Sequence, residues 1–137
     1  VSIPLIANGD LTDPGEAAAM LAASGADGLM AGRGAYGRPW LPGAIATEAA
    51  GRAFAAPEGV ALAGLGAGHY EAMLDHYGAP LGLRMARKHL GWYADRLEPT
   101  AEVKALRSAM MTAGNPREVL RMIAALFADD GSRRAAA

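Results

Sequence analysis

The sequence predicts an α/β segment followed by an all-helical segment. Two short apolar runs, at residues 2–7 and 28–31, each end in a glycine-bearing loop, as buried strands of parallel sheets do. The stretch between them has the pattern of a capped helix, and a strand–helix–strand unit of this length makes its two strands parallel. From about residue 69 onward the apolar residues recur with helical spacing only.

Composition limits the classes of function that the chain can have. The 137 residues are 52% hydrophobic and carry a net charge of −1, which is typical of a globular protein and excludes nucleic-acid binding by overall charge. The absence of cysteine removes disulfides, cysteine metal sites and cysteine nucleophiles from this chain. No apolar run is long enough to cross a membrane, so we expect a cytoplasmic protein without a membrane partner. The start lacks both a signal-peptide pattern and a methionine, and we expect a fragment truncated on its N-terminal side.

The first helix has clear boundaries in the sequence. Asp13 is a plausible N-cap, followed by proline at the first helical position and by Glu16 at the third, which is a capping-box arrangement. The helix is predicted over residues 16–23. It ends at Gly25, where glycine can take the left-handed conformation.

Two polar loops follow the two predicted strands. Asn8-Gly9-Asp10 follows the first strand and Gly32-Arg33-Gly34 follows the second. Because the carboxyl ends of parallel strands share one rim, we expect these loops to be neighbours where α/β sheets and β/α barrels bind ligands. Glycine allows close backbone approach, and Arg33 supplies a positive fork suited to phosphate. A Gly-Arg-Gly triplet is also common as a plain turn, and Asp10 has an alternative role as a turn residue.

The rest of the chain divides into a junction and a set of helices. Residues 51–68 are rich in alanine, glycine and proline, and we place a domain junction at residues 51–61. The predicted domains are thus an α/β part at residues 1–50 and a helical part at residues 62–128, with a disordered tail at 129–137. The predicted helices cover residues 39–50, 69–77 with an earlier start as an alternative, 80–97, 101–113 and 116–128. Thr100 is the predicted cap of the helix at 101–113, and Asn115 begins a second capping box before the last helix.

The helix at residues 80–97 carries a basic ridge beside its apolar face. Arg84, Arg87 and Lys88 fall on one arc, flanked by the rings of His89 and Trp92. Basic groups next to a stacking surface suit RNA, whereas the simpler interpretation is a solvated charged face.

Two features of the helical part have competing interpretations. Gly91 interrupts the basic ridge, and either a sugar–phosphate backbone or a second packed helix would explain a glycine there. His69 and His76 stand seven residues apart, too far to bind one metal ion without further ligands, so we interpret them as ordinary helix residues and predict no metal site.

Four stretches, taken together, resemble the tRNA-dihydrouridine synthase family, and the bacterial branch once named after nitrogen regulation is the most similar. They are Ile3–Asp10, Ser24–Ala35, Gly37–Leu41 and Arg84–Tyr93, the last of which contains an Arg-Lys-His-x-x-Trp-Tyr pattern. The order and spacing match from residue 1 to about residue 127. The first stretches alone could belong to other FMN-binding barrels, whereas the combination with the last one is specific.

The resemblance implies the last two β/α units of a TIM-type barrel followed by a helical tRNA-binding domain. Such enzymes reduce uridine in tRNA to 5,6-dihydrouridine with FMN, which NADPH recharges. By position, the residues implied to contact FMN are Asn8, Gly9, Asp10, Gly32 and Arg33. Those implied to face RNA are Arg84, Arg87, Lys88 and His89.

The family's proton-donating cysteine has no counterpart here. The resemblance therefore places the catalytic residue in a missing N-terminal half of the barrel and implies that this fragment alone is inactive. Two other interpretations remain open: an RNA-binding helical module without its own catalysis, and a different FMN β/α-barrel oxidoreductase.

Overall fold

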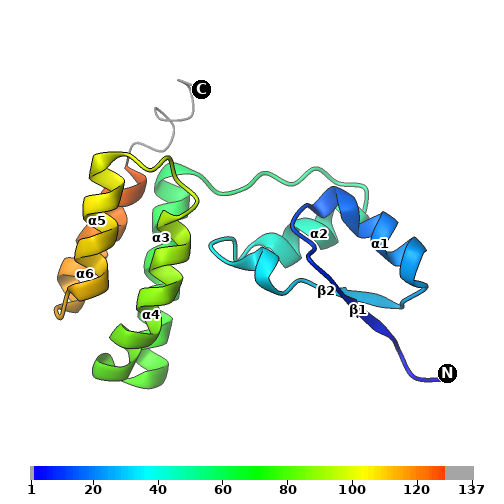
Figure 1. Cartoon of the computed structure of the whole chain (residues 1–137), viewed down its shortest axis with the longest axis horizontal. Helices are drawn as coiled ribbons and strands as arrows, with labels where there is room; N and C mark the ends of the chain where they lie inside the picture. Colours follow the sequence, from blue (N-terminus) through cyan, green and yellow to red (C-terminus); the bar gives the residue numbers. More distant parts are fainter. Residues whose placement is uncertain (1, 129–137) are drawn as a thin grey trace. The chain divides into compact units, whose positions relative to one another are not determined.

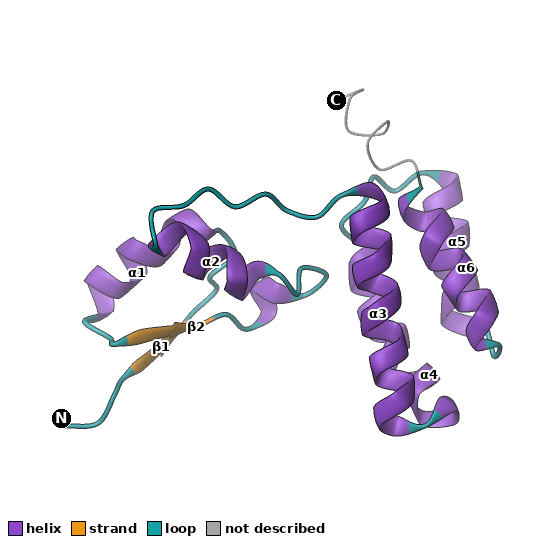
Figure 2. Ribbon diagram, turned by 180° about the vertical axis from the view of Figure 1, so that it is seen from behind, coloured by secondary structure: helices purple, strands orange, loops and turns teal. Residues whose placement is uncertain are grey.

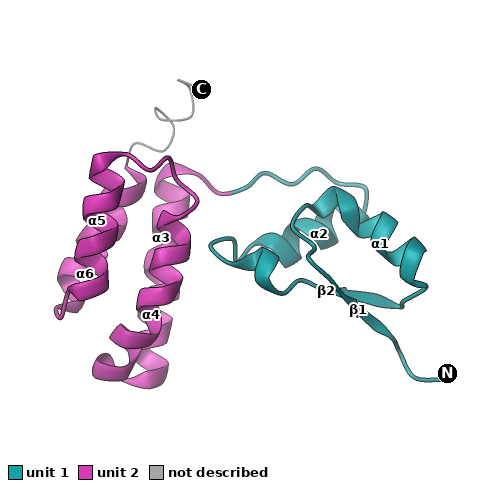
Figure 3. Cartoon of the chain, in the orientation of Figure 1, with its two compact units in different colours: residues 1–56 teal, residues 57–137 magenta. Residues whose placement is uncertain are grey.

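The computed structural model describes residues 2–128 of a chain that divides into two compact units. Unit 1 is Val1–Ala56 and unit 2 is Pro57–Ala137 (Figure 3). Within the described residues the chain forms two strands, two short 3₁₀ turns and six α-helices (Figure 1). The predicted tail at 129–137 lies outside them.

Unit 1 is a strand–helix–strand unit with one further helix. Its elements are β1 (Ile6–Asn8), the 3₁₀ turn η1 (Pro14–Glu16), α1 (Ala17–Ser24), β2 (Gly28–Met30), the 3₁₀ turn η2 (Arg33–Ala35) and α2 (Leu41–Ala49). The strands pair in parallel, with Ala7 opposite Leu29, which confirms the predicted direction. Figure 2 shows α1 and α2 together on one side of this small sheet.

The boundaries of the first helical segment follow the predicted caps. The Asp13 carboxylate accepts a hydrogen bond from the backbone N–H of Gly15 at 2.8 Å, with proline at the first position of η1. Gly25 ends α1 in the left-handed conformation at φ 61°, which glycine adopts without a steric penalty. Both predictions are therefore confirmed.

The first strand differs from its prediction in length and burial. It covers Ile6–Asn8 rather than residues 2–7, because its partner β2 supplies only three residues for pairing. Before it, Leu5 is held by the Asp27 carboxylate, which accepts the Leu5 N–H at 2.9 Å. Ile3, Leu5 and Ile6 are all exposed, so the prediction of a buried strand is wrong for the described structure. Among the described residues of unit 1, no element covers the face of the sheet on which Ile6 and Met30 are exposed.

Unit 2 is a bundle of four helices, α3 (Gly59–Tyr77), α4 (Ala79–Ala94), α5 (Ala101–Thr112) and α6 (Pro116–Phe127). α3 begins ten residues before the predicted helix at 69, and its first three residues fall within the stretch 51–61 that the sequence predicts as a junction. Its glycines mask the helical pattern, and one of them, Gly66, has a role in helix packing. A Cβ on Gly66 would lie 3.4 Å from the Ile123 side chain of α6. Small residues at such points let helices approach closely.

The helices of unit 2 also begin at the expected caps. The Thr100 hydroxyl accepts from the N–H of Val103 at 3.2 Å, and the Asn115 side chain accepts from the N–H of Arg117 at 2.9 Å. The core of the bundle consists of buried apolar side chains from all four helices, with Tyr70, Met110, Ile123, Leu126 and Phe127 among the most buried. No helix among residues 2–128 is both long and apolar enough to span a membrane.

Gly91 has a packing role in this bundle. It is buried in α4, and a Cβ built on it would lie 3.4 Å from Nη2 of Arg107 in α5. Arg107 in turn forms an ion pair with Asp95 at 2.8 Å, just after α4. Of the two interpretations of this glycine, the structure therefore supports packing against a neighbouring helix.

We predict that Gly82→Ala destabilises the bundle although alanine is the better helix former. A Cβ at Gly82 would lie 2.8 Å from both the Leu74 Cα and the Met73 carbonyl oxygen, and backbone atoms cannot yield. We expect a loss of about 1–3 kcal/mol in the free energy of unfolding, measured by urea titration with circular dichroism.

Gly68→Ala is the matched control, because nothing lies within 4 Å of a Cβ at this exposed position of α3. It should stabilise the protein by about 0.5–1 kcal/mol. Equal effects of the two substitutions would contradict the packing argument.

Candidate functional site

The two polar loops of unit 1 meet at the carboxyl ends of the paired strands. Nη2 of Arg33 lies 2.8 Å from Oδ1 of Asp10, which joins the loop after β2 to the loop after β1. Both side chains are more than three-quarters exposed, at 76% and 80%. The structure therefore brings together the residues that the parallel strands predicted to share a rim.

Gly34 makes this meeting possible. A Cβ on Gly34 would overlap the backbone carbonyl oxygen of Leu11, which is itself buried. Gly32 lies close to the same loop, since a Cβ there would be 3.6 Å from Oδ1 of Asn8. The second glycine of the triplet is thus required for contact between the loops, rather than only for a turn.

Arg38, which follows the loop after β2 in the sequence, also holds this loop in place. Nη2 of Arg38 donates a hydrogen bond to the carbonyl oxygen of Gly34 at 2.9 Å, and Nε lies 3.3 Å from the same oxygen. Arg38 is half-buried, whereas Arg33 projects into solvent. One arginine therefore holds the loop in place while the other is presented at the rim.

The Arg33–Asp10 ion pair is weak enough for Arg33 to leave Asp10 and bind another anion. An ion pair this exposed contributes about 0–1 kcal/mol, because water solvates both charges. An anion with several oxygens, such as a phosphate, offers the guanidinium a stronger charge-assisted contact. The rim thus has the elements of a phosphate site: a close-packed glycine turn and one readily released guanidinium.

The four basic residues predicted on α4 occupy different environments. Arg84 and Lys88, one helical turn apart, are exposed. Arg87 is half-buried, with Nη2 lying 3.5 Å from the carbonyl oxygen of Ala113 at the end of α5. Its buried Nε has no hydrogen-bond partner among the described residues. His89 is half-buried among rings, so only two of the four side chains project freely into solvent.

A connected set of rings lies between α3 and α4. The ring centroids of His69 and His89 are 5.0 Å apart, and those of His89 and Trp92 are 4.9 Å apart, both edge to face. Nδ1 of His69 also lies 3.2 Å from the hydroxyl of Tyr93, whose ring packs against Phe127 in the core. We call His69, His89, Trp92 and Tyr93 the ring cluster. It extends from the core of unit 2 to its surface.

Burial shifts the ionisation of this cluster toward its neutral forms. Desolvation lowers the pKa of His69, and it lowers that of His89 together with the nearby charges of His69 and Lys88. Desolvation raises the pKa of Tyr93 to about 12, so the phenol keeps its proton and can donate it to Nδ1 of His69. At neutral pH the cluster is therefore an uncharged aromatic surface beside a lysine.

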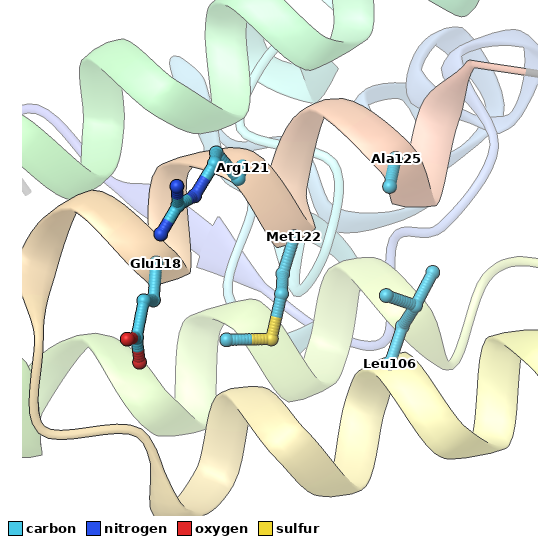
Figure 4. Close-up of a pocket in the computed structure, with 5 residues that line it drawn as sticks. All are labelled: Leu106, Glu118, Arg121, Met122 and Ala125. Carbon is cyan, nitrogen blue, oxygen red and sulfur yellow. The ribbon is translucent and has the colours of Figure 1, made fainter.

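A separate groove lies between α5 and α6. It has a volume of about 490 Å³ and is lined by Leu106, Glu118, Arg121, Met122 and Ala125. Figure 4 shows Met122 extending from α6 toward α5 and Leu106 extending from α5 toward α6. None of its lining residues belongs to the predicted flavin or RNA sets.

Two participants in these sites could not be recognised in the sequence. The sequence predicts an ordinary helix residue at His69 and indicates no special role for Leu11. His69 becomes a partner of His89 only through the packing of α3 on α4, and Leu11 contributes a backbone carbonyl that any residue would supply. Neither role can therefore be recognised from the type of residue or from its spacing in the sequence.

We predict that unit 2 loses stability as the pH falls below 6.5, the ordinary pKa of histidine. The folded-state pKa values of His69 and His89 lie below the ordinary value of 6.5, so the unfolded chain binds protons first as the pH falls. Their stabilisation is complete above pH 6.5 and is lost as the pH decreases below it. Urea unfolding of the His89→Gln variant should depend less on pH than that of the parent chain.

The control for this prediction is His76→Gln, at an exposed position near the end of the same α3. It should leave the pH dependence of the parent unchanged. The account fails if His89→Gln and His76→Gln have the same pH profile.

Comparison with known proteins shows the family to which the chain belongs. The family described as Dihydrouridine synthase (Dus) matches residues 1–128. A probable tRNA-dihydrouridine synthase of Rhodobacter capsulatus is 45% identical over 130 residues, which cover 94% of this chain and 39% of the relative. One from Rhizobium leguminosarum is 44% identical, covering 87% and 35%, and tRNA-dihydrouridine synthase B of Xanthomonas campestris is 44% identical, covering 77% and 32%. The chain spans between about a third and two fifths of the length of these relatives, and it belongs to the dihydrouridine synthase family.

Proposed function

We propose that this chain forms the last two β/α units and the helical RNA-binding domain of a flavin-dependent tRNA-dihydrouridine synthase. The main support is the rim of unit 1, where the loops after β1 and β2 meet through Arg33 and Asp10 at 2.8 Å. The similarity to relatives named as tRNA-dihydrouridine synthases supplies the substrate class. Their greater length leaves room for the remaining barrel units.

The residues at the rim fit the phosphate end of FMN. The Gly34 contact with Leu11 brings backbone of both loops to one place, and Arg33 provides a mobile cation for the phosphate oxygens. The side chains of Asn8 and Asp10 supply oxygen atoms that suit the hydroxyl groups of a ribityl chain. In this proposal Gly9 and Gly32 keep side chains out of the space beside the cofactor.

The chemistry divides between cofactor and protein. FMN, recharged by NADPH, supplies hydride transfer to the uracil ring. The residues of this chain bind and orient the phosphate end of the cofactor and hold the RNA. Because the chain has no cysteine, the proton donor of the family would come from elsewhere in the full enzyme, and this chain alone would be inactive.

In unit 2 the proposed RNA contacts centre on α4. Arg84 and Lys88 are exposed and one helical turn apart, so they can contact successive phosphates. Arg87 and His89 would support this surface from half-buried positions. The compact core of unit 2 also suits the alternative of an RNA-binding module without catalysis, which the two experiments below separate from the enzyme.

We expect Arg33→Glu to weaken FMN binding in a chimera that carries this chain in place of the matching segment of the Rhodobacter capsulatus relative. The substitution replaces a phosphate-binding cation by a repelling anion, and we expect affinity to fall roughly 10- to 100-fold, as for loss of a charged hydrogen bond. Flavin absorbance of the purified protein and fluorescence titration measure the change.

Arg52→Glu, an exposed change of the same kind after α2, is the control and should retain flavin. A chimera that folds but contains no flavin would argue for the RNA-binding module. Retention of flavin by Arg33→Glu would remove Arg33 from the site.

We expect the double substitution Arg84→Gln with Lys88→Gln to weaken tRNA binding by the chain. Two phosphate contacts are lost, so the slope of log affinity against log salt should become shallower by about 2. Lys104→Gln with Arg117→Gln removes two exposed cations from α5 and α6 and should change the slope less. Filter binding at several salt concentrations decides the question, and identical slopes for the two double variants would exclude α4 as the contact surface.

A further inference from the structure

The exposed end of the ring cluster has a geometry that a solvated charged face does not need. Nζ of Lys88 lies 5.6 Å from the centre of the Trp92 ring, which is a cation–π distance. The indole is half-buried, and the edge-to-face contact with His89 limits its orientation. A large aromatic ring is thus held at the surface with a mobile cation above it.

The support behind Trp92 is continuous. His89 contacts His69, His69 meets the hydroxyl of Tyr93, and the Tyr93 ring packs on Phe127. Tyr93 and Phe127 are almost completely buried, at 3% and 1% exposure. The cluster therefore fixes the indole from the core outward, and the ring loses little conformational freedom when a ligand stacks on it.

We propose that Trp92 is a stacking platform for an unpaired RNA base, which displaces the ammonium group of Lys88 toward the adjacent phosphate. This inference rests on the proposed function, since it assigns a specific contact within the RNA surface of unit 2. Both groups keep a partner in this exchange. The indole ring exchanges its contact with the ammonium group for a stacked base, and Lys88 exchanges its contact with the ring for a phosphate. An unstacked base is the ligand chemistry that needs both at once.

The location of Lys88 supports this assignment. Its side chain is exposed and flexible, and Arg84 lies one turn away on the same helix. A base on Trp92 would therefore have its backbone beside two cations. A purely structural role for Trp92 would require neither the lysine above the ring nor its partial exposure.

The experiment follows the fluorescence of Trp92 in the full chain carrying Trp40→Phe, because the sequence has only two tryptophans. Titration with an oligouridylate should quench the emission. Heparin, a polyanion without bases, should bind to the same cations with little quenching. Quenching by the RNA alone is the expected signature of stacking.

Variants at Trp92 then measure the contribution of the ring. Trp92→Leu should weaken oligouridylate binding about 5-fold or more, as for loss of one base–aromatic stack, while heparin affinity stays within twofold. Trp92→Phe should recover part of the loss, since it keeps an aromatic face. Thermal melting of each variant shows whether the fold is intact, and the quenching result needs no variant at this position.

The outcomes separate the two proposals. Binding of oligouridylate without quenching, together with unchanged affinity of Trp92→Leu, overturns the platform and leaves the RNA surface standing. Equal losses of RNA and heparin affinity in Trp92→Leu assign the ring a structural role and also overturn it. Failure of the chain to bind any RNA at low salt overturns the RNA surface itself and the platform with it.

Discussion

The parallel pairing of β1 with β2 determines where every residue of the candidate cofactor site lies. With Asn8 opposite Met30, both strands end at the same level, and the chain leaves them in the same direction. A shift of one residue in this register would move alternate side chains to the opposite face of the sheet. The contact between Gly34 and Leu11 then closes the gap between the two loops. Three residue pairs and one glycine thus suffice to build the rim.

Two arginines in this region have different roles because their surroundings differ. The Arg38 guanidinium donates a hydrogen bond to the carbonyl oxygen of Gly34 and so holds the loop in place. Arg33 pairs with Asp10 in solvent, where the pair adds little stability. A stabilising role and the proposed ligand-binding role are therefore separated by five residues of sequence. The weakly held arginine is the one that a ligand can recruit at low cost.

The sequence predicted most of the fold because its signals are local. The caps at Asp13, Thr100 and Asn115 depend on hydrogen bonds within one helical turn, and all three form. The sequence leaves the start of α3 open, because glycine and alanine conceal the helical pattern between residues 59 and 68. The exposure of Ile3 and Ile6 has another cause: apolar strand residues are expected to be buried, whereas the described residues place helices on one side of the two-stranded sheet (Figure 2).

The candidate sites were predictable to the extent that they follow from strand direction and helical periodicity. The meeting of Asp10 and Arg33 follows from two strands being parallel, and the exposure of Arg84 and Lys88 follows from the position of the apolar arc. The ring cluster was not predictable, because His69 and His89 are brought together by the register between two helices. That register depends on Gly82, which allows the backbones of α3 and α4 to approach closely. A glycine outside the ring cluster therefore lets α3 and α4 approach closely enough for the two histidines to meet.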